Sequence, residues 1–124
     1  MIKTKNFNPE TDIKLLCTCG HKNCDKRSVK QSVLNRLQVL RSTVNRPLII
    51  TSGGRCPNHP NEIHRVIPAD HQKGLGVDIA VINGLERGEI VRAGIECGFN
   101  AIGVAATFVH LGFRDGEQIV MWTY

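Results

Sequence analysis

The segment from Asp70 to Asp78 constrains the fold of this chain more than any other, and it reads D-H-Q-K-G-L-G-V-D. It places the imidazole of His71 and the carboxylate of Asp78 seven residues apart, with two glycines between them. The β-branched residues at its end predict a strand from Val77 to Ile82. Because glycine adopts turn conformations that other residues avoid, the chain can bring His71 back over this strand. His71 and Asp78 would then meet as two ligands of a zinc ion. A turn histidine and a strand-end aspartate without a metal are the alternative.

His110 is the best candidate for a third ligand. It lies in a predicted strand, Phe108–Arg114, in which Val109, Leu111 and Phe113 form an apolar face. His110 therefore points away from the core, and Asp78 does the same in the strand Val77–Ile82. We expect both side chains to face one cleft.

Apolar spacing and turn residues predict two helices and five strands. The first helix begins at the N-cap Ser28 and runs to about Thr43, with Val33, Leu37, Leu40 and Val44 as its apolar stripe. The second runs from about Leu85 to Cys97, between the cap Asn83 and Gly98. The strands are expected at Leu48–Thr51, Val77–Ile82, Ala101–Ala105, Phe108–Arg114 and Gln118–Thr123. The polar segment Ser52–Asp70 contains three prolines, and a loop of this length in so small a domain is usually functional.

Length and charge limit the class of protein. The chain has 124 residues, enough for one domain, and its 41% hydrophobic and 22% charged residues are ordinary for a soluble globular protein. Its formal charge is +5, with the basic residues concentrated between Lys14 and Arg55. Such a balance suits nucleic acid or an acidic polymer such as the bacterial envelope, although a solvated basic surface without a partner is also common. No apolar run predicts a membrane span, and no signal peptide is recognisable, so we expect synthesis in the cytoplasm.

The five cysteines are expected to be reduced, because their number is odd and no export signal precedes them. Three of them form the pattern C-x-C-x4-C, at Cys17, Cys19 and Cys24. This pattern can form a small structural zinc knuckle, although its spacing is not a standard one, and His21, Cys56 or Cys97 would have to complete the four ligands. Partly buried free thiols are the alternative.

Three motifs in this order resemble the M15 family of zinc D-alanyl-D-alanine carboxypeptidases. They are I-T-S-G-G-R-C-P from Ile50 to Pro57, H-x2-G-x3-D-I from His71 to Ile79, and F-V-H from Phe108 to His110. The similarity extends from about Phe7 to Trp122. The branch most similar to this chain contains small phage and prophage proteins described as peptidoglycan-cleaving endopeptidases or endolysins.

The resemblance implies that His71, Asp78 and His110 bind one Zn2+ ion. It also implies a role for Arg55, since the arginine of the family's S-G-Y-R segment holds the substrate's carboxylate or the developing oxyanion. A guanidinium offers a rigid, permanently charged fork for such a group. Without the family likeness, Arg55 would be interpreted as a solvated loop arginine.

The sequence departs from the family pattern at several positions. Gly54 stands in place of the tyrosine of S-G-Y-R, Ala69 in place of a serine and Gly76 in place of an alanine, while His64-Arg65 replaces an expected glycine pair. The catalytic acid is missing as well. Many members have Asp or Glu three residues before the last histidine, where this chain has Thr107, and small phage members have Asp two residues after it, where this chain has Gly112. The nearby groups that can substitute are Glu62, Asp70, Asp115, Glu117, His59 and His64.

Three hypotheses follow. The first is a zinc metallopeptidase of phage or prophage origin that cleaves peptide bonds in bacterial peptidoglycan and acts at the cell wall as an endolysin or virion component. Its expected fold is α+β: a single compact domain over residues 1–124, with two main helices and a mostly antiparallel sheet that carries the zinc site on one face. The loop Ser52–Asp70 would form one wall of the cleft.

The second hypothesis is a zinc-containing peptidoglycan-binding module that has lost turnover, because the acid is missing at both Thr107 and Gly112. The third is a nucleic-acid-binding protein built on the segment Cys17–Cys24. One tryptophan, one tyrosine and four phenylalanines offer few stacking platforms, which argues against this partner. The sequence carries no signal for an oligomeric state.

Overall fold

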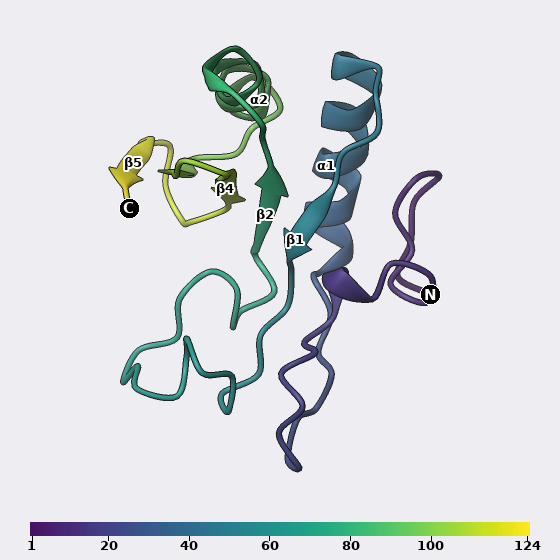
Figure 1. Ribbon diagram of the computed structural model, residues 1–124, viewed down its shortest axis with the longest axis vertical. Coiled ribbons are helices and arrows are strands. Elements are labelled where there is room, and N and C mark those ends of the chain that lie inside the picture. Colours follow the sequence, from purple (N-terminus) through teal and green to yellow (C-terminus); the bar gives the residue numbers. More distant parts are fainter.

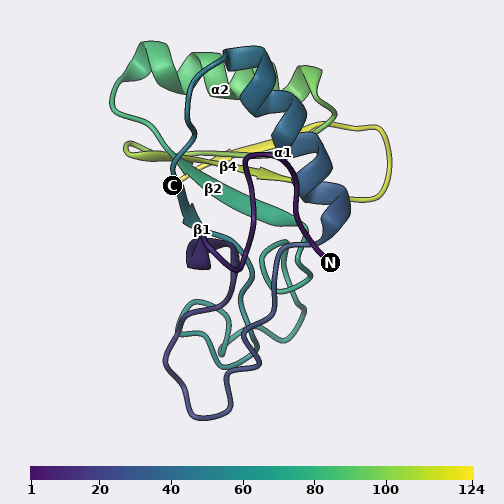
Figure 2. The same ribbon diagram turned by 90° about the vertical axis from the view of Figure 1, so that its right-hand side faces the viewer.

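A five-stranded sheet forms the centre of the computed structural model, which describes residues 1–124, and two helices cover one face of this sheet (Figures 1 and 2). The elements in chain order are a 3-10 turn η1 (Ile13–Leu15), helix α1 (Gln31–Val44), strands β1 (Ile50–Ser52) and β2 (Gly76–Ala80), helix α2 (Gly84–Glu96), and strands β3 (Ala101–Val104), β4 (Phe108–Gly112) and β5 (Val120–Thr123). The strand order is β1-β2-β4-β3-β5, and neighbours are antiparallel except for β3 and β5. This architecture confirms the predicted α+β domain with two helices and a mostly antiparallel sheet. None of its helices is long and apolar enough to cross a membrane.

The hydrophobic core lies between the helices and one face of the sheet. Val77 and Ile79 of β2 and Val109 and Leu111 of β4 are buried in it. The helices contribute Val33, Leu34, Leu37 and Leu40 of α1 and Ile90 and Ala93 of α2. Burying one such large side chain contributes about 1.5–3 kcal/mol, and a one-residue slip of a strand would turn its apolar residues away from the core. The core therefore fixes which residues of β2 and β4 face the other side.

Helix α1 begins later than predicted. Ser28 is not its N-cap, because Ser28 pairs with Leu16 in an isolated bridge and its hydroxyl donates to the carbonyl of Val29. The N-cap is Lys30, which makes no side-chain cap and whose backbone N–H donates to the carbonyl of Gly74. The predicted stripe is correct at three positions, but Val44 is only half-buried, and Leu34 takes part instead.

The other elements differ from the prediction mainly at their ends. Strand β1 occupies residues 50–52 instead of 48–51, and Ile49 before it is exposed. The remaining strands are one or two residues shorter than expected, and β2 also begins one residue earlier. The limits of α2 are close to the prediction: the Asn83 side chain accepts a hydrogen bond from the N–H of Glu86, and Gly98 has a φ of 98°.

Two long loops lie side by side beneath the sheet in Figure 2. One joins η1 to α1, and the other spans residues 53–75 between β1 and β2. The N–H of Gly54 donates to the carbonyl of Leu15 at 3.1 Å, and the Arg27 guanidinium donates to the carbonyl of Gln72 at 3.0 Å. A Cβ atom on Gly54 would lie 2.2 Å from the carbonyl oxygen of Arg27, so only glycine fits there. The first loop thus takes the room that a tyrosine at position 54 would need.

Candidate metal centre

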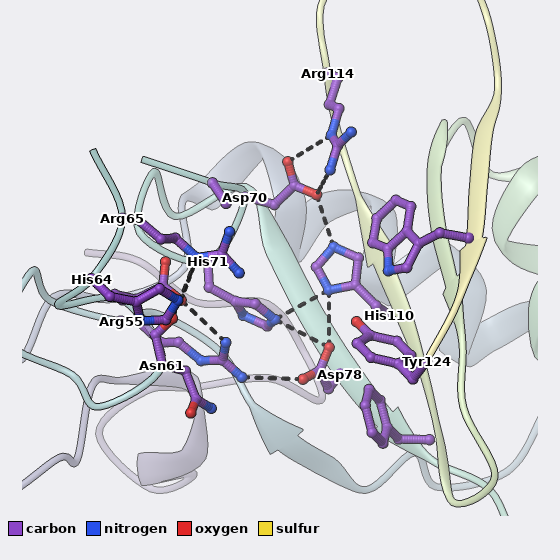
Figure 3. Close-up of a pocket in the computed structure, with 14 residues that line it drawn as sticks. Arg55, Asn61, His64, Arg65, Asp70, His71, Asp78, His110, Arg114 and Tyr124 are labelled. Atoms are coloured by element: carbon purple, nitrogen blue, oxygen red, sulfur yellow. Dashed lines mark hydrogen bonds and ion pairs between the residues drawn. The ribbon is translucent and has the colours of Figure 1, made fainter. Parts of the chain in front are cut away.

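The register of β2 and β4 pairs Asp78 directly with His110, on the sheet face opposite the core. Asp78 Oδ1 lies 2.9 Å from His110 Nδ1. His71 reaches the same point from the loop before β2, which turns at Gly74 with a φ of 73°. His71 Nε2 lies 3.1 Å from both Asp78 Oδ1 and His110 Nδ1. All three side chains are buried and point toward one another (Figure 3). The structure thus brings together the three residues predicted to bind zinc.

A hydrogen bond on its outer side fixes the ring of His71. Its Nδ1 lies 2.7 Å from the carbonyl oxygen of Gly53, and a carbonyl oxygen can only accept. Nδ1 therefore carries the proton, and Nε2 of the neutral ring turns a lone pair toward Asp78. Metal-binding histidines are commonly oriented by such a carbonyl partner.

His110 is oriented by a carboxylate. Its Nε2, on the side of the ring away from Asp78, lies 2.9 Å from Asp70 Oδ2. Burial alone would lower the pKa of His110, but its hydrogen bonds with Asp70 and Asp78 raise that pKa above the ordinary value. Nε2–H donates to Asp70, so Nδ1 faces His71 and Asp78, where it donates to Asp78 in the protonated ring and offers a lone pair to a cation in the neutral ring.

Asp70 is held in turn by Arg114. Arg114 Nε lies 3.1 Å from Asp70 Oδ1, and its Nη2 lies 3.3 Å from Oδ2. Burial would raise the pKa of Asp70, but hydrogen bonds from His110 and Arg114 lower it below the usual range. The guanidinium also lies 4.9 Å from the centre of the Trp122 ring, which is 5.3 Å from the ring of His110. Sequence reasoning considered Asp70 only as a substitute base and missed Arg114 and Trp122.

The chemistry of the converging atoms fits a zinc ion. They are two imidazole nitrogens and one carboxylate oxygen, which zinc commonly binds. Burial would raise the pKa of Asp78, but its contacts with His110 and His71 lower that pKa below the usual range, so this carboxylate carries negative charge. Acceptor atoms only 2.9–3.1 Å apart repel one another unless a cation or a proton lies among them. Tetrahedral ligands about 2.0–2.1 Å from zinc are roughly 3.3 Å apart, close to these separations.

Arg55, which belongs to the loop predicted to form one wall of the cleft, lies beside this centre. Its Nη2 is 3.4 Å from Asp78 Oδ2, and its Nη1 is 3.4 Å from Glu62 Oε2. Its Nε donates to Ser52 Oγ at 3.1 Å. These contacts hold a single guanidinium between two carboxylates at the edge of the metal centre.

A pocket of about 580 Å³ contains the centre (Figure 3). Its lining consists of charged and polar groups and three aromatic rings: Arg55, Asn61, Glu62, His64, Arg65, Ala69, Asp70, His71, Asp78, Phe108, His110, Arg114, Trp122 and Tyr124. Among the groups considered as substitutes for the missing acid, Glu62, Asp70 and His64 line the pocket. Asp115, Glu117 and His59 do not.

Glu62 is the carboxylate in this pocket with an unused oxygen. Its side chain is 1% exposed, and its Oε2 lies 3.4 Å from both Arg55 and Arg65. Its Oε1 is buried and has no hydrogen-bond partner. Buried polar atoms without a partner are rare because they are costly, so Glu62 lines the pocket while one of its oxygens stays unpaired.

Comparison with protein families matches residues 5–112 to the family described as Peptidase M15. The chain belongs to the peptidase M15 family. Membership of this family of zinc peptidases confirms the resemblance at the level of the M15 family and indicates peptide-bond hydrolysis with zinc as the cofactor. The matched M15 range includes Arg55, His71, Asp78 and His110 and ends before Arg114. A comparison with curated proteins found no match.

Proposed function

We propose that this protein is a zinc-dependent metallopeptidase that hydrolyses peptide bonds in the stem peptides or cross-links of bacterial peptidoglycan. The bond would be of the D-alanyl type, cut in a carboxypeptidase or endopeptidase reaction. We also propose that it is an endolysin-like protein of phage or prophage origin that acts at the cell wall. One observation carries the proposal: acceptor atoms of His71, Asp78 and His110 converge in the pocket of an M15 protein while Gly53 and Asp70 engage the outer ring nitrogens.

His71 Nε2, Asp78 Oδ1 and His110 Nδ1 are the atoms that would hold the zinc ion. A zinc ion held by these three ligands would supply the Lewis acid that activates water and polarises the scissile carbonyl. The carbonyl of Gly53 and the carboxylate of Asp70 keep the two rings in the orientation that metal binding needs. Asp70 is therefore a positioning residue, since it acts through His110.

The pocket offers guanidinium groups to an anionic peptide. Three arginines line it and balance its three carboxylates, so a bound zinc ion would give the site a net positive charge, and stem peptides carry free carboxylates. The contacts of Arg55 with Glu62 and Asp78, at 3.4 Å, are long for charge-assisted hydrogen bonds, which are usually 2.7–2.9 Å. The Arg55 fork can therefore turn its N–H groups toward a substrate carboxylate or a developing oxyanion.

We assign the general base to Glu62. A peptidase needs a group that takes the proton of the attacking water and passes it to the leaving amine. Glu62 lines the pocket, and its Oε1 is an acceptor without a partner. Both oxygens of Asp70, in contrast, are engaged by His110 and Arg114.

The second candidate function is a peptidoglycan-binding module without turnover. Thr107 and Gly112 favour it, because the family acid is missing at both positions. Loss of a general base costs on the order of a hundredfold to ten-thousandfold in rate. Such a protein would keep the metal centre and the arginines of the pocket and would bind stem peptides without cutting them.

A turnover assay separates the two functions. Zinc-loaded protein is incubated with purified peptidoglycan, and new free amino groups are counted against a chelator-treated sample. We expect release that the chelator abolishes, and mass spectrometry of the fragments then identifies the bond. Sedimentation with peptidoglycan without any release of amino groups, in protein whose metal centre holds zinc, would establish the binding module instead.

A further inference from the structure

Four of the five cysteines meet outside the pocket. Cys17, Cys19 and Cys24 come from the loop between η1 and α1, and Cys56 comes from the loop of residues 53–75. Their sulfur atoms all lie within 4.8 Å of one another. Of the three residues that the sequence left open as a fourth ligand, the structure selects Cys56. Cys97 lies in the hydrophobic core, and His21 is not in the cluster.

The spacing of the sulfur atoms corresponds to ligands of one metal ion. Four thiolates about 2.3 Å from a zinc ion in tetrahedral geometry are roughly 3.8 Å apart. The sulfur atoms of Cys19 and Cys56 are 3.6 Å apart, and every other separation stays below 4.8 Å. Two chain segments distant in sequence therefore place four soft ligands around a single point.

The backbone beside the cysteines is shaped around their sulfur atoms. Gly20 follows Cys19 with a φ of 76°, and Lys26 adopts a φ of 52°, which is uncommon for a residue with a side chain. This turn brings the N–H of Lys26 to 3.4 Å from Cys24 Sγ. Donation from a backbone N–H stabilises the negative charge of a metal-bound thiolate.

The loop that carries three of these cysteines has little else to order it. Residues 18–27 read T-C-G-H-K-N-C-D-K-R, without a large apolar side chain, and they form no helix or strand. Fixing each backbone residue costs roughly 1–2 kcal/mol of conformational entropy, and a polar loop buries too little apolar surface to offset this. Metal ligation supplies the missing free energy in small domains of this kind.

The charges around the cluster also suit a zinc tetrathiolate, which carries a net negative charge. Residues 18–27 hold three basic side chains, Lys22, Lys26 and Arg27, and one acidic side chain, Asp25, which pairs with Arg27. Cys17 and Cys56 are buried, while Cys19 and Cys24 are half-buried. The cluster is thus shielded from solvent on one side and lies in a basic segment on the other.

We propose that Cys17, Cys19, Cys24 and Cys56 bind one structural zinc ion, separate from the metal centre in the pocket. Four protein ligands close the coordination shell, which is the arrangement of structural zinc sites. Because Cys56 directly follows Arg55, the ion joins the N-terminal loop to the segment that presents Arg55 to the pocket. The proposal stands apart from the peptidase function, because neither set of ligands contains a residue of the other.

Metal stoichiometry tests this site. The full chain, purified with a reductant, is loaded with zinc, freed of excess metal and measured by elemental analysis. We expect two zinc ions in the wild type and one in H71A/H110A, which keeps only the cysteine site. Cys24→Ser is expected to hold only the pocket zinc, and Cys97→Ala, the matched control, is expected to keep both ions. One zinc in the wild type and none in H71A/H110A would overturn the proposal, as would iron in place of zinc.

Two measurements keep the test decisive if Cys24→Ser does not fold. Cobalt loaded into H71A/H110A should give the near-ultraviolet charge-transfer absorption of thiolate ligands. In the zinc-loaded wild type, a thiol reagent should not modify the four cluster cysteines until a chelator is added. Four thiols that react freely in the zinc-loaded protein, or disulfides found by mass spectrometry, would overturn the site. Failure of the peptidase function would leave all of these readouts unchanged.

Discussion

The carboxylate of Asp70 fills the space that a side chain on Gly112 would occupy. A Cβ atom on Gly112 would lie 2.8 Å from Asp70 Oδ2, and one on Gly76 would lie 2.9 Å from the Cβ of Asp70. The family resemblance led us to expect an aspartate at Gly112 and an alanine at Gly76. The chain therefore keeps a carboxylate beside His110 but supplies it from the residue before His71.

Gly112→Ala should weaken zinc binding at the metal centre. The new methyl group would lie 2.8 Å from Asp70 Oδ2 and 3.0 Å from His110 Nε2 and would force the two apart. Removing such a supporting partner typically costs about tenfold to a hundredfold in metal affinity. Competition with a chromophoric chelator measures this affinity. Gly88→Ala is the matched control, because nothing lies within 4 Å of a Cβ at that helical position. Equal zinc affinity in the two variants would show that the contact between Asp70 and His110 does not tune the metal.

His71→Ala should remove the pocket zinc together with the hydrolytic activity. The variant loses one of three ligands, and the remaining pair of Asp78 and His110 cannot hold the ion at micromolar concentrations. Elemental analysis and the amino-group assay measure the two effects. His64→Ala serves as control, since this histidine lines the same pocket outside the ligand cluster. A His71→Ala protein that still holds zinc in the pocket would contradict the ligand assignment.

Glu62→Gln should lower kcat on the order of a hundredfold to ten-thousandfold, because the amide cannot take a proton. Glutamine nearly preserves the shape of the side chain and can still accept a hydrogen bond from Arg55, so zinc content is expected to stay unchanged. The comparison is Glu117→Gln, which alters a carboxylate outside the pocket. An unchanged kcat in Glu62→Gln would assign the proton transfer to another group.

Arg55→Lys should reduce kcat/KM on substrates that carry a carboxylate next to the scissile bond. Lysine keeps the charge but not the fork, and a hydrogen bond to a charged group contributes about 1.5–3 kcal/mol, or roughly tenfold to a hundredfold. Steady-state kinetics on two peptides, with and without that carboxylate, measure the effect. The kcat/KM of the peptide without the carboxylate should not fall. Arg92→Lys, on the exposed face of α2, should leave the kcat/KM of both peptides unchanged. Equal losses on both peptides would point to a structural role for Arg55.

The sequence was sufficient for the features that follow from local periodicity. Alternation in the short strands predicted that Asp78 and His110 turn away from the core, and the register of β2 and β4 pairs them. Asn83 and Gly98 predicted the limits of α2, because a capping side chain and a left-handed glycine act within a few residues.

Long-range pairing accounts for what the sequence missed. Trp122 reaches His110 because β5 pairs with β3 in parallel and places Trp122 beside Gly103, which in turn faces His110. No local sequence pattern predicts a pairing between strands that are distant in the sequence. The start of α1 was wrong for a related reason, since a backbone hydrogen bond from Lys30 to distant Gly74 decides it. The role of Asp70 depends on space left by two glycines that are distant from each other in the sequence.

The contact between Gly54 and the carbonyl of Arg27 has a consequence for exchanging segments between relatives. A donor segment with tyrosine at position 54 would collide with the backbone of the N-terminal loop of this chain, even if it folds well in its own parent. A working chimera must therefore inherit both loops from the same parent. The two loops must therefore be exchanged together, although more than twenty residues of sequence separate them.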